Sequence, residues 1–188
     1  MQSQKPSKRP RTYLPPLAIG DSTMIFALPS LAAEGYDANA RGCRQFPEAI
    51  ALLSSLRHAH TLPHLVVIAL GANGSVTDPY VREALAVLGH ARQLVLVTPR
   101  EAGGGSGSDA VTVRAQARRH PGRVRVLDWV AYSAGHAAWF QPDRLHLTFA
   151  GARAMRIERS AGARFLCVYS HRSTITQLAH LGARAVHV

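Results

Sequence analysis

Short apolar runs alternate along this chain with longer segments in which apolar residues recur at helical spacing. The clearest run is HLVVIALG at 64–71, which is apolar almost throughout and ends on a glycine. A run of this kind is typical of a strand that is buried on both faces. Three similar runs and the short segment YDANA complete the set, so we predict strands at 15–20, 36–40, 64–71, 92–99 and 122–129.

Helices are predicted in the segments that separate these strands. In QFPEAIALLSSLRHA the apolar positions fall on one helical face, and in DPYVREALAVLGH an Asp-Pro pair provides a start signal. The glycine-rich segment EAGGGSGS at 101–108 lacks the ending of a phosphate-binding loop and is predicted to be a flexible loop. The predicted helices are 24–35, weakened by Pro29, 45–59, 78–90 and 109–120.

Apolar strands that alternate with helix-length segments indicate a parallel sheet covered on both faces. We therefore predict an α/β fold, a three-layer α/β/α sandwich with a mainly parallel five-stranded sheet and right-handed crossovers. In such sheets the ligand crevice lies at the carboxyl ends of the strands. Ser22, Asn73 and the segment 140–148 each follow one of these ends, so we expect three polar features on one rim.

The formal charge of +11 in 188 residues changes this picture little, because most of it lies at the two ends of the chain. Residues 1–14 carry +4, residues 151–188 carry +5, and residues 15–150 carry only +2. A nucleic-acid-binding domain would show a basic face within its core, so we expect no nucleic-acid partner. We divide the chain into a flexible, basic, Pro-rich lead-in at 1–14, a folded domain at 15–158 and an atypical basic tail at 159–188, for which disorder is one expectation.

Other compositional signals exclude several classes of protein. Cys43 and Cys167 are the two cysteines of the chain, and they fit neither a disulfide framework nor a zinc-site spacing. His58, His60 and His64 have no accompanying Cys or carboxylate, so we expect no metal and no other cofactor. No apolar run is long enough to span a bilayer, and no apolar segment follows the basic N-terminus as in a signal peptide. The expected compartment is therefore the cytoplasm.

Two of the polar features at the strand ends each admit two interpretations. Ser22, in GDS at 20–22, either caps a following helix or presents its hydroxyl as a nucleophile. Asn73, in GANG at 71–74, either forms a turn or donates its side-chain amide to an oxyanion, together with the N–H of a glycine such as Gly71. The sequence at these two places leaves both interpretations open.

The third feature, FQPDRLHLTFAGARA at 140–154, contains an acid and a histidine three residues apart. This spacing lets the Asp143 carboxylate fix the tautomer of His146 through its Nδ1 proton, which leaves Nε2 to take a proton from a serine. Thr148 is expected to cap a helix that begins at Phe149.

Together, the three pieces resemble the SGNH, or GDSL-type, hydrolase family. GDS matches the family's nucleophile block, GANG its Gly-x-Asn block and DRLH its Asp-x-x-His block, in the family's order. The segments NARGCRQF, VVIALGANG, VLDWVAYSAGH and WFQPDRLHLTFAGARA are similar to SGNH domains attached to integral-membrane acyltransferases of bacterial envelope polysaccharides. The resemblance implies the flavodoxin-like SGNH hydrolase fold.

The resemblance also implies a role for each site residue. Ser22 would be the nucleophile, His146 the general base and Asp143 the residue that orients it. The oxyanion hole would use the Ser22 backbone N–H, the Asn73 side chain and a backbone N–H from the RGCR turn. Gly42 is our choice within that turn, with Cys43 as the alternative, and Asp21 would be a supporting residue.

The chain departs from the family pattern at three places. Gly74 replaces a second acid, and Arg144 stands where the acyltransferase-linked branch usually has glycine, which would favour anionic substrates or simply face water. After Ala154 the family expects a closing amphipathic helix, and the tail at 159–188 lacks the corresponding period.

The function expected from this resemblance is that of a serine esterase acting on small O-acyl esters, O-acetyl esters above all. The alternative is an O-acyltransferase that passes the acyl group to a carbohydrate hydroxyl. A second alternative is a catalytically inactive domain that binds carbohydrate or docks on a partner. The expected partners are an acyl ester or acylated carbohydrate and, as a candidate, a membrane acyltransferase; the sequence predicts no oligomeric state.

Overall fold

A single mixed sheet forms the centre of the molecule in a computed structural model that describes residues 2–5 and 14–155. Within these residues the strand order is β1-β3-β2-β4-β5-β6. All neighbouring strands are parallel except β1, which runs antiparallel to β3. The strands are β1 (Gln2–Gln4), β2 (Leu17–Gly20), β3 (Asp37–Ala40), β4 (Leu65–Ala69), β5 (Gln93–Val97) and β6 (Val124–Leu127).

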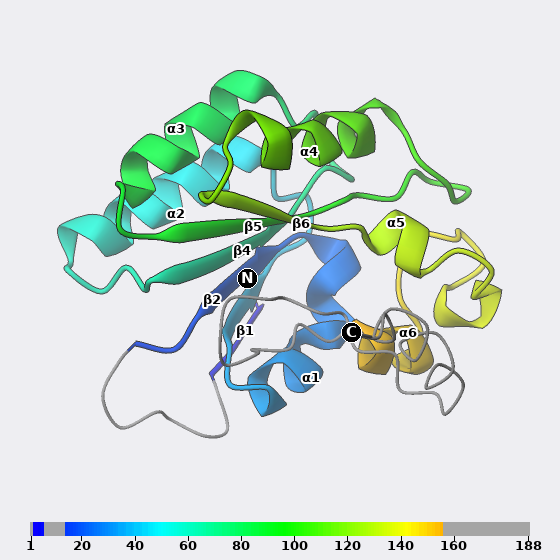
Figure 1. Cartoon of the computed structure of the whole chain (residues 1–188). Coiled ribbons are helices and arrows are strands. Elements are labelled where there is room, and N and C mark those ends of the chain that lie inside the picture. Colours follow the sequence, from blue (N-terminus) through cyan, green and yellow to red (C-terminus); the bar gives the residue numbers. More distant parts are fainter. Residues whose placement is uncertain (1, 6–13, 156–188) are drawn as a thin grey trace, which may run out of the picture.

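Helices cover both faces of this sheet (Figure 1). On one face lie α2 (Phe46–His58), α3 (Asp78–Leu88) and α4 (Ser108–Arg119). On the other lie α1 (Leu28–Ala33) and α6 (Phe149–Ala154), with the 3-10 helix η1 (Ser22–Ala27) beside α6. The short helices α5 (Trp129–Tyr132) and η2 (Ala137–Trp139) complete the described elements. Each face has its own buried apolar cluster, so the predicted three-layer α/β/α sandwich is confirmed.

The predicted sheet of five strands is one strand short. Gln2–Gln4, which we assigned to the flexible lead-in, pair with β3 in the register Ser3↔Asn39. All three residues are polar and exposed, so no apolar pattern marks them as a strand. A strand at a sheet edge is held by its backbone hydrogen bonds, which the sequence pattern does not reveal. Residues 6–13 and 156–188, and with them Cys167 and the tail, lie outside the described residues.

The helix signals correspond to the observed boundaries for α2, α3 and α6, whereas the segment predicted as one helix at 24–35 forms the 3-10 helix η1 followed by the short helix α1, which has Pro29 in its first turn. The apolar face predicted for 45–59 is buried at Phe46, Ala49, Ile50 and Leu53. α3 begins at Asp78 as expected, with Thr77 as its N-cap residue. Thr148 caps α6 by accepting a hydrogen bond from the Gly151 backbone N–H, as predicted.

The strand order places a topological switch at β2. The chain passes from β2 to β3 on one side and then to β4 on the other, so that β2 lies between them. In open α/β sheets, ligands bind at the carboxyl ends of the strands next to such a switch. Ser22 directly follows β2 and Asn73 follows β4, so both lie at this edge. Among the described residues, no helix is both long and apolar enough to cross a lipid bilayer.

Candidate active site

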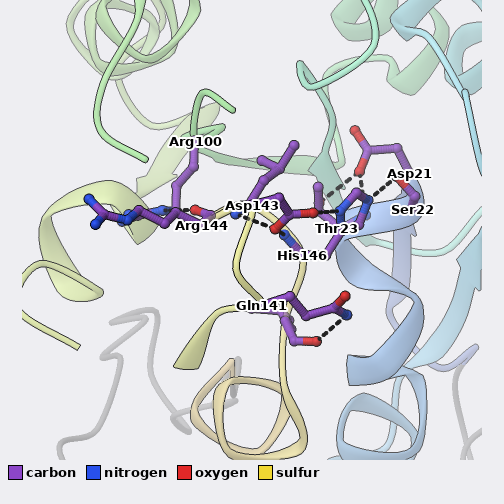
Figure 2. A network of polar contacts seen from close by, with 10 residues as sticks. Asp21, Ser22, Thr23, Arg100, Gln141, Asp143, Arg144 and His146 are labelled. Atoms are coloured by element: carbon purple, nitrogen blue, oxygen red, sulfur yellow. Dashed lines mark hydrogen bonds and ion pairs between the residues drawn. The ribbon is translucent and has the colours of Figure 1, made fainter. Parts of the chain in front are cut away.

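A chain of hydrogen bonds joins Ser22, His146 and Asp143. The Oγ atom of Ser22 lies 3.0 Å from Nε2 of His146. The Nδ1 atom of the same ring lies 2.6 Å from Oδ2 of Asp143. Figure 2 shows the imidazole between the serine and the carboxylate, with η1 supplying the serine and the segment before α6 supplying the other two. The structure thus brings together the three residues that the sequence predicts to act together.

The Asp143 carboxylate is held as an anion by three donors. Its Oδ1 atom accepts hydrogen bonds from the backbone N–H groups of Leu145, at 2.9 Å, and His146, at 3.0 Å. The hydrogen bond from the His146 side chain and the one from the Leu145 backbone lower the pKa of Asp143 from 3.8 to about 2. The carboxylate therefore stays ionised over the whole physiological range and can stabilise a positive charge on the imidazole.

The turn that carries Ser22 is built by Gly20 and Asp21. Asp21 is 1% exposed and caps η1, since its Oδ1 atom accepts hydrogen bonds from the Thr23 backbone N–H and hydroxyl. The interpretation of Ser22 as a helix cap is therefore wrong, because its neighbour performs that task. A Cβ atom at Gly20 would lie 2.6 Å from the Cβ of Met24, so only glycine allows η1 to fold back onto the end of β2.

Asn73 carries a buried donor that is not used. Among the described residues, its Nδ2 atom has no hydrogen-bond partner although it is buried. Such an atom is unfavourable unless another group, such as a ligand, accepts from it. The GANG turn is tied to the nucleophile turn by a 3.4 Å contact from the Ala72 backbone N–H to Oδ2 of Asp21. Gly71 has a φ of +135°, and its missing Cβ makes room for Pro99.

The RGCR turn at 41–44 is fastened to the same strand end. The backbone N–H of Arg41 donates to the Gly20 carbonyl over 3.2 Å, and the Arg44 guanidinium donates to that carbonyl over 3.0 Å. Gly42 is exposed, with open space around it. Cys43 is exposed and has a φ of +56°, a left-handed conformation that usually selects glycine. The backbone donor in this turn stays a prediction that names Gly42 or Cys43.

Arg44 supports the site, although no sequence signal pointed to it. It is only 4% exposed and donates to the backbone carbonyl of Asn39 over 2.8 Å and to its Oδ1 atom over 2.7 Å. Burial and the nearby Arg41 lower the pKa of Arg44, whereas Asp21 acts in the opposite direction. Arg44 thereby joins β2, β3 and the turn into one unit. A single arginine in a run of polar residues gives no sequence signal of such burial.

Aromatic side chains pack beside the site. Trp129 is buried, and its ring stacks on that of Trp139 at 5.9 Å, in keeping with packing rather than a sugar-binding platform. Among the described residues, no group of three or more His, Cys, Asp or Glu side chains is arranged to hold a metal ion.

The fold and the order of the site blocks are those of SGNH/GDSL-type hydrolases, and comparisons with known proteins support this assignment. The peptidoglycan O-acetyltransferase OatA of Listeria monocytogenes is 31% identical over 167 residues, which cover 81% of this chain and 26% of the relative. The O-acetyltransferase OatA of Staphylococcus aureus is 30% identical over 148 residues, which cover 74% of this chain and 23% of the relative. The chain thus spans about a quarter of the length of these curated relatives. No family model matches the chain.

Solved structures show the same fold. The C-terminal catalytic domain of Streptococcus pneumoniae peptidoglycan O-acetyltransferase A, carrying a methylsulfonyl adduct, superposes with a TM-score of 0.58 at 22% identity, covering 74% of this chain and 86% of that domain. A lipolytic protein of the G-D-S-L family from Veillonella parvula superposes with a TM-score of 0.51 at 12% identity, covering 73% and 91%. The resemblance expected from the sequence is therefore confirmed, and the relatives support the expected enzyme class, a serine hydrolase or O-acyltransferase.

Proposed function

We propose that this chain transfers small acyl groups, acetyl above all, from an oxygen ester through a covalent ester on Ser22, with water as the acceptor in the simplest reaction. The observation that supports this most is the 3.0 Å contact between Ser22 Oγ and His146 Nε2, with Asp143 on the opposite side of the imidazole. Serine catalysis requires a nucleophile, a base and an orienting carboxylate in this spatial order.

In the first step, Ser22 Oγ forms a bond to the ester carbonyl carbon while His146 Nε2 accepts the hydroxyl proton. The imidazole becomes positively charged, and Asp143, whose pKa of about 2 keeps it ionised, stabilises that charge. The carbon–oxygen bond to the leaving alcohol then breaks. His146 returns the proton to the alcohol oxygen, and the acyl group remains on Ser22.

Between these events the former carbonyl oxygen carries a negative charge. We assign its stabilisation to the Ser22 backbone N–H, the Asn73 amide and an N–H from the 41–44 turn. The unpaired Nδ2 atom of Asn73 supports this assignment, because a preorganised donor gives most stabilisation where charge develops in the transition state. In the second step the oxygen of a water molecule forms a bond to the acyl carbon while His146 Nε2 accepts one of its protons. The bond between the acyl carbon and Ser22 Oγ then breaks, His146 returns the proton to Ser22 Oγ, and the carboxylic acid leaves.

A second candidate function is O-acyl transfer to a carbohydrate hydroxyl in place of water. The names of the Listeria and Staphylococcus relatives favour it, since both are O-acetyltransferases. The same three side chains would serve both reactions, because a sugar hydroxyl and a water molecule are attacking groups of the same kind.

The test is hydrolysis of p-nitrophenyl acetate, measured with and without a soluble peptidoglycan-derived oligosaccharide. We expect turnover by the wild-type chain and by a Ser75→Ala control, and none above background for Ser22→Ala. Acetylated oligosaccharide found by mass spectrometry would favour the transferase, whereas acetate alone would favour the esterase. Equal turnover by wild type and Ser22→Ala would overturn the proposal for either acceptor.

A further inference from the structure

Arg100 lies just beyond the carboxyl end of β5 and contacts three residues with one guanidinium group. Its Nε atom donates to the Arg144 carbonyl oxygen over 3.2 Å, and its Nη1 atom donates to Ser133 Oγ over 2.8 Å. The guanidinium carbon also lies 4.1 Å above the centre of the Phe140 ring. Burial lowers the pKa of Arg100. The planar, delocalised cation of arginine suits such a combination of stacking and directional donation.

The glycine-rich segment that follows Arg100 approaches the same turn. The Gly103 backbone N–H donates to the Asp143 carbonyl oxygen over 2.9 Å. Gly104 has a φ of +92°, and a Cβ atom there would lie 3.3 Å from the Cβ of Arg144. Further along, the hydroxyl of Ser106 accepts a hydrogen bond from Arg114. The segment predicted to be a flexible loop is thus anchored against the turn that carries Asp143.

This turn is exposed and contains a residue in the left-handed conformation, although the Gln141 backbone N–H donates to the His146 carbonyl and the Arg144 backbone N–H to the Gln141 carbonyl, each over 2.8 Å. Asp143 and Arg144 are both exposed, and Arg144 has a φ of +56°. The left-handed conformation is unfavourable for a residue with a side chain, because the Cβ atom comes too close to the backbone. The Asp143 carboxylate accepts from two backbone N–H groups of the following residues, so its direction depends on the path of this backbone.

We propose that Arg100, together with the Gly103 amide, is a positioning residue of the acyl-transfer site. The two donors hold the carbonyl groups of Asp143 and Arg144 and so keep the carboxylate directed at His146. In Figure 2 Arg100 and Arg144 lie on the side of Asp143 that faces away from His146 and Ser22. The kinetic part of this inference rests on the proposed function.

Arg92 provides a matched control at the opposite end of the same strand. It directly precedes β5, is half-buried like Arg100, and donates to the backbone carbonyls of Leu62 and Leu88, each over 3.2 Å. The variants Arg100→Met and Arg92→Met therefore remove comparable donors, one beside the site and one remote from it. If both variants lose stability to the same extent, that loss reports a structural role of each arginine. A lower kcat in Arg100→Met than in Arg92→Met reports the positioning of Asp143 by Arg100.

We expect Arg100→Met to lower kcat for p-nitrophenyl acetate by roughly 10- to 100-fold with little change in KM, because small displacements of catalytic groups have effects of this size. Arg92→Met should keep the wild-type kcat. Should Arg100→Met fail to fold, Arg100→Lys is compared with Arg92→Lys, since lysine keeps the charge but loses the rigid fork. A kcat equal to that of the Arg92 variant in either comparison would overturn the proposal.

A second measurement needs no substrate. The proton on His146 Nδ1 should give a downfield proton resonance, since it lies in a 2.6 Å contact with Asp143. We expect this resonance in the wild type and Arg92→Met, and its broadening or loss in folded Arg100→Met or Arg100→Lys. An unchanged resonance in the Arg100 variant would overturn the positioning role. A wild-type chain that shows the resonance but hydrolyses no ester would contradict the proposed function and leave the positioning role standing.

Discussion

The Oγ atom of Ser22 and the Nε2 atom of His146 lie 3.0 Å apart, although 124 positions of sequence separate the two residues. The contact forms because both residues lie at the carboxyl edge of the sheet, Ser22 directly after β2 and His146 in the segment that leads into α6. The parallel arrangement of the strands collects these loops at one edge. The parallel topology of the sheet therefore brings the two atoms together.

The first prediction concerns the unpaired donor of Asn73. We expect Asn73→Ala to lower kcat for a short-chain ester by roughly 10²–10³, because an oxyanion donor acts mainly once charge has developed. KM should change little. The measurement is kcat and KM for folded wild type and Asn73→Ala, with Ser75→Ala in the same loop as control. An unchanged kcat in a folded Asn73→Ala enzyme would contradict the oxyanion role and indicate that the GANG segment only forms a turn.

The second prediction concerns the close approach at Gly20. Gly20→Ala should destabilise the chain by about 1–3 kcal/mol, because the new Cβ would press on a Cβ atom in η1 that cannot move by itself. Gly42→Ala meets nothing within 4 Å and should change stability by less than about 0.5 kcal/mol. Urea unfolding of both variants checks this. Equal stability of the two would show that η1 does not pack on β2 as described.

The strands and helices were predictable where apolar residues recur at a regular spacing in the sequence. The apolar strands β4 and β5 and the apolar face of α2 are recognisable because burial requires those residue types at those spacings. β1 was not predictable, because three polar residues that pair at a sheet edge show no apolar pattern. For residues 2–4, the prediction of a flexible lead-in is wrong, because these residues form β1.

The site was predictable only as far as it consists of recognisable blocks. Ser22, Asn73, Asp143 and His146 stand in such blocks, and the structure brings Ser22, Asp143 and His146 into contact. Capping was one of two interpretations left open for Ser22, because the side chains of Ser22 and Asp21 can both accept a hydrogen bond at a helix start; in the structure Asp21 caps η1. The contacts of Arg44 and Arg100 join distant segments, so no local pattern reveals them.

The third prediction concerns acid. The pKa of Asp143 is lowered from 3.8 to about 2, so its charge stabilises the folded chain above pH 3.8 and this contribution is lost as the pH falls toward about 2. Asp143→Asn lacks the charge but keeps an oxygen for the backbone donors. The difference in free energy of unfolding between wild type and Asp143→Asn should therefore shrink over this interval. A constant difference from about pH 6 downward would contradict the assigned cause of the shift.

The central claim is that Ser22 is the nucleophile, and it makes the fourth prediction. Ser22→Ala should lose on the order of 10⁴–10⁶ of the esterase rate while its circular dichroism stays that of the wild type. The most direct measurement is mass spectrometry of the chain after treatment with a serine-directed phosphonate. We predict one adduct, on the peptide that contains Ser22, with activity lost in proportion to labelling and no adduct on Ser22→Ala. An adduct on another residue, or an equally labelled Ser22→Ala, would contradict the account.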